Sequence, residues 1–179
     1  MKRIIPLLLF CLPDFIGHAQ TITRANFMLN HRADNFRSIE LELDNGLQVG
    51  ITGNGALLYV TDEYGEDLPP GEYQDLISYY DRFDIHDIPG RIKSIGAIKI
   101  AYNNTFDIHE KAGTLKSIGD IQVKYYNTFD IHDPKGKVKS VGKVSVKYYN
   151  AFDPDTLEGM IKSIEGNSRR VAVWGPKPY

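Results

Sequence analysis

A 23-residue repeat constrains the fold of this chain more than any other feature of its sequence. The string FDIH occurs at Phe83–His86, Phe106–His109 and Phe129–His132, and a fourth copy keeps only Phe152 and Asp153. Glycines and serines follow the same interval, at Gly90, Gly113, Gly136 and Gly159 and at Ser94, Ser117, Ser140 and Ser163. Matches at so many positions predict a repeat architecture in which each copy forms one structural unit.

Apolar residues alternate within each copy, which indicates β-strands with one buried face. In the third copy one parity is occupied by Ile121, Val123, Tyr125, Phe129 and Ile131. We therefore expect a long strand over residues 121–133. Along it, the Phe and Ile of FDIH would be buried and the Asp and His would point outward.

Two glycine turns punctuate each copy. The segment Asp133-Pro134-Lys135-Gly136 is typical of a type I turn, and Gly119 breaks the alternation at a tight turn or a bulge. A short strand, Lys137–Val141, lies between such turns. We expect it to pair with Phe129–Asp133 on one side and with Val144–Tyr149 on the other.

These patterns predict an all-β fold. The 23-residue β-hairpin repeats would form an antiparallel meander, and the mismatch of long and short strands would stagger and coil the sheet. The alternative is a β-solenoid that stacks one coil per copy. In either geometry a sheet with one apolar face must roll up, pack on other strands or dimerise.

Residues 1–19 have the pattern of an export signal. Lys2 and Arg3 precede a short apolar run, and small residues come before Gln20. The run is too short to span a bilayer, which needs about 20 residues. Cys11, the single cysteine, lies inside this segment, so no disulfide is expected in the rest of the chain. We expect an exported protein, periplasmic or extracellular, without a membrane span.

The segment 20–75 is predicted to be an N-terminal β-meander followed by an acidic loop. Alternation at Ile39, Leu41 and Leu43 precedes a hairpin turn at residues 44–46. Strands are expected at residues 47–51 and 56–61, and the acidic loop at 62–75. The four repeats would occupy 76–174, ending in a strand over residues 170–174, and residues 175–179 would form a tail.

The string YYNTFDIHDPKGKVKSVGKVSVKYY, together with the export signal ending in HAQ, resembles small secreted repeat proteins of Bacteroidetes-type bacteria. It is more loosely similar to tyrosine-aspartate (YD, or RHS-type) repeats, in which an aromatic-Asp pair precedes a glycine-containing turn. The resemblance covers residues 79–174 and implies a scaffold fold. It transfers no catalytic residue to this chain.

The repeated Asp-x-His pairs are candidate metal ligands. On a strand, residues i and i+2 point the same way, and a carboxylate with an imidazole suits zinc or copper. The candidates are Asp84, His86, Asp107, His109, Asp130 and His132. Equivalent strands of a meander lie about 9.6 Å apart, so only a solenoid would let copies share an ion. In the structural alternative, these residues pair with basic residues of the short strands.

A polar sheet face with repeated tyrosines is a candidate ligand surface. Tyr80, Tyr126 and Tyr149 would lie in register with outward Lys, Asp and His side chains. Such a face could grip a glycan or a protein ligand. A formal net charge of −2 with no basic patch argues against nucleic acid as the partner.

No enzymatic motif is present: the chain has no nucleophile elbow, HExxH or phosphate-binding glycine loop. We therefore expect no catalytic residues and no cofactor. The sequence favours an exported, non-enzymatic β-repeat protein that acts as an envelope scaffold or binding module. Two alternatives are a metal-binding protein that uses the Asp-x-His pairs and a small envelope hydrolase with an acidic pair in 62–75.

Overall fold

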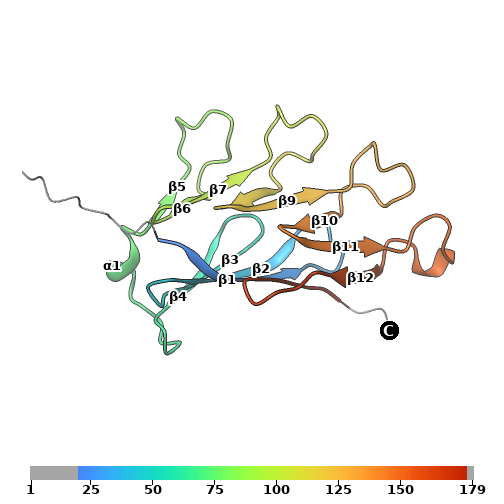
Figure 1. The fold of residues 1–179 in the computed structure, drawn as a ribbon. Coiled ribbons are helices and arrows are strands. Elements are labelled where there is room, and N and C mark those ends of the chain that lie inside the picture. Colours follow the sequence, from blue (N-terminus) through green and yellow to red (C-terminus); the bar gives the residue numbers. More distant parts are fainter. Residues whose placement is uncertain (1–19, 177–179) are drawn as a thin grey trace, which may run out of the picture.

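The computed structural model describes residues 20–176 as two β-sheets packed face to face (Figure 1). The N-terminal sheet has five strands in the order β13-β1-β2-β3-β4. Their bounds are Ile22–Leu29 for β1, Phe36–Leu43 for β2, Gln48–Ile51 for β3, Leu57–Thr61 for β4 and Val171–Trp174 for β13. The predicted export signal, residues 1–19, and the end of the predicted tail, 177–179, lie outside the described residues.

The repeats form the second sheet, whose eight strands follow one another in chain order and are all antiparallel to their neighbours. The strands are β5 (Ile77–Tyr79), β6 (Ile92–Ile95), β7 (Ile98–Tyr102), β8 (Leu115–Ile118), β9 (Ile121–Tyr125), β10 (Val138–Val141), β11 (Val144–Tyr148) and β12 (Ile161–Glu165). The predicted all-β antiparallel meander is thus confirmed.

Each repeat is a hairpin with one very short and one long connection. The short connections are two-residue turns whose first residue is Gly96, Gly119 or Gly142, with φ of 53–55°. A positive φ at this position suits a type II′ hairpin turn, which glycine adopts without a steric penalty. The long connections are the segments that carry FDIH.

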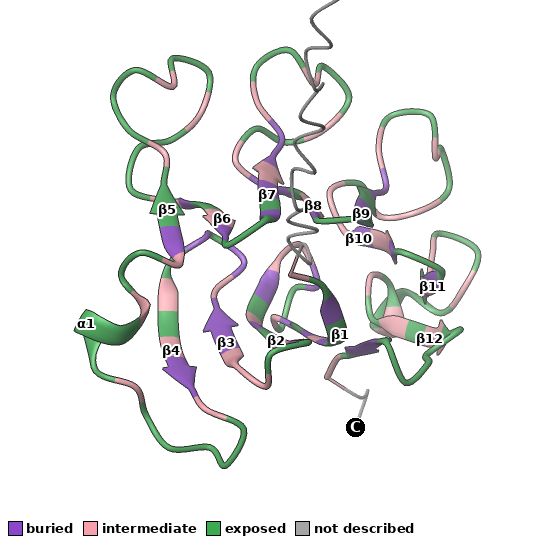
Figure 2. Ribbon diagram, turned by 60° about the vertical axis from the view of Figure 1, so that its left-hand side comes forward, coloured by how far each residue is buried: buried purple, intermediate pink, exposed green. Residues whose placement is uncertain are grey.

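The apolar face of the meander is covered by the N-terminal sheet. Of the three arrangements expected to bury it, packing on other strands is the one observed. Side chains from both inner faces form one core cluster that includes Phe27, Ile39, Ile95, Ile118 and Val146. In Figure 2 the buried residues lie mainly on the strands, among exposed ones, and the loops are mostly exposed. Packing of two sheets through their inner faces is a usual solution for strands with one apolar side.

Backbone hydrogen bonds also join the two sheets. The amide of Ile92 donates to the Gly55 carbonyl at 2.9 Å, and the amide of Val138 donates to the Ala33 carbonyl at 2.8 Å. The chain then returns to its beginning, because β13 pairs in parallel with β1. The strand over residues 170–174 was predicted, but β1 and its pairing with β13 were not.

The N-terminal hairpins agree with the prediction, since β2, β3 and β4 are joined by turns at Gly46 and Gly55 with positive φ. The acidic segment 62–75 is mostly loop but contains one short helical turn, α1 (Pro70–Tyr73). A 3-10 turn, η1 (Asp155–Leu157), lies in the last repeat.

The long strand predicted over residues 121–133 is wrong. β9 ends at Tyr125, and FDIH lies in the loop that follows. As a result β10 pairs with Val123–Tyr125 rather than with 129–133, whereas its pairing with the start of β11 is as predicted. Phe129 and Ile131, expected in the core, are 72% and 75% exposed. The strand ends at Tyr125 because the Asn127 and Asp130 side chains of the loop accept hydrogen bonds from the loop's own backbone amides.

Candidate functional site: a row of repeated loops

Four loops project side by side from the same ends of the meander strands (Figures 1 and 2). We number them in chain order: the first loop spans residues 80–91, the second 103–114, the third 126–137 and the fourth 149–160. Successive loops are separated by two strands, so equivalent residues repeat at intervals of about 9.6 Å. All the predicted metal ligands lie in these loops.

A pair of polar side chains ends each strand and shapes each loop. In the second loop the Phe106 amide donates to the Asn104 side chain at 2.9 Å, and the Asn104 amide donates to the Asp107 carboxylate at 3.0 Å. The other loops repeat both bonds, with Asp81 in the place of asparagine in the first loop. Because Asn and Asp offer the backbone these local bonds, they favour turns over a continued strand.

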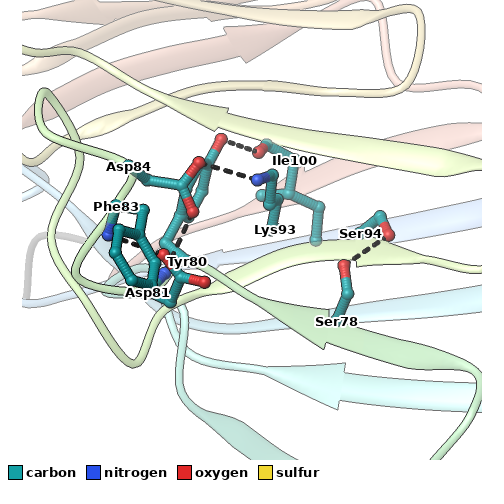
Figure 3. A network of polar contacts seen from close by, with 8 residues as sticks. All are labelled: Ser78, Tyr80, Asp81, Phe83, Asp84, Lys93, Ser94 and Ile100. Carbon is teal, nitrogen blue, oxygen red and sulfur yellow. Dashed lines mark hydrogen bonds and ion pairs between the residues drawn. The ribbon is translucent and has the colours of Figure 1, made fainter.

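The Asp of FDIH is also tied to the adjacent short strand. A lysine nine residues later donates to its second oxygen in all four loops, at 2.5–2.9 Å. The pairs are Asp84–Lys93, Asp107–Lys116, Asp130–Lys139 and Asp153–Lys162. Figure 3 shows the first of them. This lysine hydrogen bond is the main cause that lowers the pKa of each aspartate.

The His of FDIH contacts the next loop instead of its own. The His86 ring lies 4.7 Å from the Phe106 ring, centroid to centroid, and the His109–Phe129 and His132–Phe152 pairs are each 4.8 Å apart. These distances and the steep ring angles are those of edge-to-face or tilted aromatic pairs. The histidines therefore link the four loops into one continuous row.

The ends of the row explain the exceptions in the repeat. The fourth loop has no histidine after Phe152, and it has no following loop for a histidine to contact. Among residues 20–176 no histidine ring pairs with Phe83 in the first loop. Its ring is instead covered by the Arg82 guanidinium at 4.9 Å, a cation–π distance.

The loops expose a row of apolar side chains, which we call the apolar ridge. It consists of Phe83, Ile85, Phe106, Ile108, Phe129, Ile131 and Phe152, which are 69–80% exposed. Single exposed apolar residues are ordinary, but seven of them gathered on neighbouring loops form a patch of the kind that marks an interaction site. The ridge was not predicted from the sequence, because its residues continue the apolar alternation that is typical of a strand with one buried face.

The three tyrosines predicted as a ligand surface have structural partners in the sheet. Tyr126 is buried and donates its hydroxyl to the Val146 carbonyl at 3.1 Å; Tyr80 donates to the Ile100 carbonyl at 2.9 Å (Figure 3). Tyr149 is half-buried, and the Lys162 ammonium lies 5.3 Å from its ring centroid. The three tyrosine rings lie under the lysines of the Asp–Lys pairs. The polar sheet face on which these tyrosines were expected does not form, because the strands end before it.

The six predicted metal ligands are separated by the same contacts. Each Asp binds a lysine and a backbone amide, and each His turns to the following loop. Within residues 20–176 no group of three or more His, Cys, Asp and Glu side chains is placed to hold a metal ion.

Acidic residues outnumber basic ones in the four loops, by ten to five. Those that take no part in the Asp–Lys pairs or in the turn at Asp81 are Asp87, Glu110, Asp133, Asp155 and Glu158. Glu110 is half-buried and one of its carboxylate oxygens has no hydrogen-bond partner. Burial is the main cause that raises the pKa of Glu110, with the Asp107 and Asp130 charges adding to it.

A cavity of about 810 Å³ lies where the third and fourth loops meet the β1–β2 connection. Its lining combines Arg32 and Lys137 with Asp155, Glu158 and Met160. No residue of the acidic segment 62–75 lines it. The acidic pair predicted in that segment therefore does not face this cavity.

In the comparison with known proteins, no family model, no curated protein and no solved structure matches this chain. None of the helical segments in residues 20–176 has the length and apolarity that crossing a bilayer needs.

Proposed function

We propose that this protein is an exported, non-enzymatic binding module of the cell envelope whose apolar ridge docks a protein partner. The observation that carries the proposal is the exposure of seven apolar side chains on four loops that their own polar contacts hold in place. Exposed aromatic and aliphatic side chains in one patch are the usual anchors of protein interfaces.

The loops are organised before a partner arrives. The Asp–Lys pairs and the Asn or Asp turns fix each loop, and the His–Phe contacts fix each loop to the next. Loops ordered in advance lose less conformational entropy on binding, so more of the contact energy appears as affinity. This order supports an interface role better than a flexible surface would.

The charges around the ridge favour a protein over a lipid surface. Anionic membranes attract clusters of Lys and Arg, whereas the four loops carry ten Asp and Glu residues against five Lys and Arg residues. A partner with an apolar groove and basic residues beside it would complement both features. The regular spacing also lets several weak contacts add up on one elongated partner.

The proposal is tested by comparing the wild type with Phe106→Ser and Phe129→Ser variants in capture from an envelope extract, followed by titration of the purified captured protein. Removing a central aromatic anchor is expected to weaken that affinity at least about tenfold, as for an interface hot spot. Tyr64→Ser is the matched control, because Tyr64 is 82% exposed but lies outside the ridge.

Two outcomes would contradict the proposal. One is equal affinity of the wild type and both ridge variants for the captured protein. The other is binding of the wild type to anionic vesicles that the two ridge variants lose, which would place a membrane on the ridge.

A further inference from the structure

The outer face of the N-terminal sheet carries a second surface, on the side of that sheet that is turned away from the meander. Trp174 on β13 is 53% exposed, and Met28, its register partner on β1, is 41% exposed. Ser38 on β2 lies opposite Met28. Trp174 is the single tryptophan of the chain. Large aromatic side chains usually bury most of their surface.

Two shallow depressions adjoin on this face. The first, about 240 Å³, is lined by Asn26, Met28, Ser38, Glu40 and Trp174. The second, about 230 Å³, shares Asn26 and Glu40 and continues to Arg24, Glu42 and Gln48. They therefore form one elongated polar track across β13, β1, β2 and β3, with the tryptophan at one end.

Small residues flank the centre of the track. Asn26 pairs with Ala172 on one side and with Glu40 on the other, and Glu40 pairs with Gly50. The Tyr59 ring lies across Gly50, where any Cβ would collide with it. A second aromatic side chain thus lies beyond Glu40 on the same face.

The polar groups of the track retain unused hydrogen-bonding capacity. Within residues 20–176 the side chains of Asn26, Ser38 and Gln48 make no hydrogen bond to another protein group, while Arg24 and Glu42 form an ion pair of 3.3 Å. Amide groups donate and accept at once, which matches the hydroxyl groups of a sugar. An aromatic face offers the apolar surface on which the C–H face of a pyranose ring packs.

We infer that this track binds an oligosaccharide. A short chain of sugar rings would pack one ring on Trp174 and place hydroxyls on Asn26, Ser38 and Gln48. A second copy of the chain fits less well, because a stable dimer buries about 800 Å² per partner with an apolar centre. This inference concerns a different sheet from the apolar ridge and does not depend on it.

The tryptophan itself reports on the site. The purified protein is titrated with cellohexaose, chitohexaose, xylohexaose and maltohexaose while the emission of Trp174 is recorded. At least one sugar is expected to shift or quench the emission in a saturable way. Failure of all four at millimolar concentration would overturn the inference.

Three variants sharpen the test. Asn26→Ala keeps the tryptophan and is expected to weaken binding at least tenfold in the same titration, and Trp174→Ala is expected to abolish it by calorimetry. Phe106→Ala, on the apolar ridge, is expected to bind the sugar as the wild type does, so failure of one site is distinguishable from failure of the other. Thermal midpoints identify any variant that does not fold.

Two further results would also overturn the inference. The first is unchanged sugar affinity in Asn26→Ala and Trp174→Ala. The second is a dimeric wild type in sedimentation that becomes monomeric with Trp174→Ala, because the track would then be an interface between copies.

Discussion

Each residue of FDIH has a separate physical task. Asp107 binds its own loop and the adjacent strand through the Asn104 amide and Lys116. His109 contacts the following loop, and Phe106 receives the histidine of the preceding one. Ile108 contacts the solvent and is the residue most available to a partner. A motif that looks like a metal site in one dimension is therefore a loop-building unit in three.

The pH dependence of the loops follows from the aspartates. Their lowered pKa means that the charged form is favoured by folding, so the Asp–Lys contribution is complete above the ordinary value of 3.8. It is lost as the pH falls through the lowered values. The amides of Asn104 and Asn127 donate to two of these aspartates. Their hydrogen-exchange protection factors, taken relative to an unstructured chain at the same pH, are expected to fall below about pH 4 while the strands stay protected.

The control for this prediction is Asp107→Asn. Its second loop should exchange quickly at neutral pH, while the first loop keeps the wild-type profile. Uniform loss of protection in loops and strands together would assign the acid effect to global unfolding instead.

Gly136 tests the turn that closes the third loop. Its φ is +78°, and no atom lies within 4 Å of the position a Cβ would take. Gly136→Val is therefore expected to lose about 1 kcal/mol or more in the free energy of unfolding, from backbone strain alone. Gly71→Val is the matched control, because Gly71 is equally open and has no positive φ. Equal urea midpoints for the two variants would refute this assignment.

At the scale of elements, the hairpins were predictable and the loops were not. Alternation at Ile98, Ile100 and Tyr102 correctly predicted a strand with one buried face, and the glycine turns correctly separated the strands. The same alternation continued by coincidence through Phe129 and Ile131. Asn127 and Asp130, both turn formers, were the signal that the strand had ended. At the end of these strands the turn-forming side chains outweigh the apolar periodicity.

The tertiary pairings needed the structure as well. Nothing in residues 22–29 or 171–174 indicates that they are parallel neighbours. The track at Trp174 arises only from that pairing, and the ridge arises only from loops two strands apart. Local patterns predict elements, whereas both candidate sites are formed between elements.

The His–Phe contacts should couple neighbouring loops energetically. A double-mutant cycle of His109→Ala and Phe129→Ala is expected to give a coupling of about 0.5–1.5 kcal/mol in urea unfolding, as for other aromatic pairs. His86 and Phe129 belong to loops that are not neighbours, so the same cycle on that pair should give none. Equal coupling in both cycles would mean that the row does not act pair by pair.

At the scale of the whole molecule, the two sheets share one core and should unfold together. Ile39 in β2 and Ile118 in β8 are both fully buried. Ile39→Ala and Ile118→Ala are each expected to cost about 2–5 kcal/mol and to shift one cooperative transition. Ile108→Ala, which removes a side chain that is 80% exposed, should change the stability by less than about 0.5 kcal/mol. Two separate calorimetric transitions, each moved by one variant only, would show that the sheets fold independently.

The His–Phe contacts give the row a direction. In each inner copy the histidine contacts the phenylalanine of the next loop, and the phenylalanine contacts the histidine of the previous loop. Inner copies are therefore interchangeable, and gene duplication could insert another one without breaking a loop contact. Each insertion would nevertheless carry the last copy about 9.6 Å further from the first. The strand that follows it must still reach β1, because β13 pairs there. The position of β1 in the N-terminal sheet therefore limits the number of copies that this protein can hold.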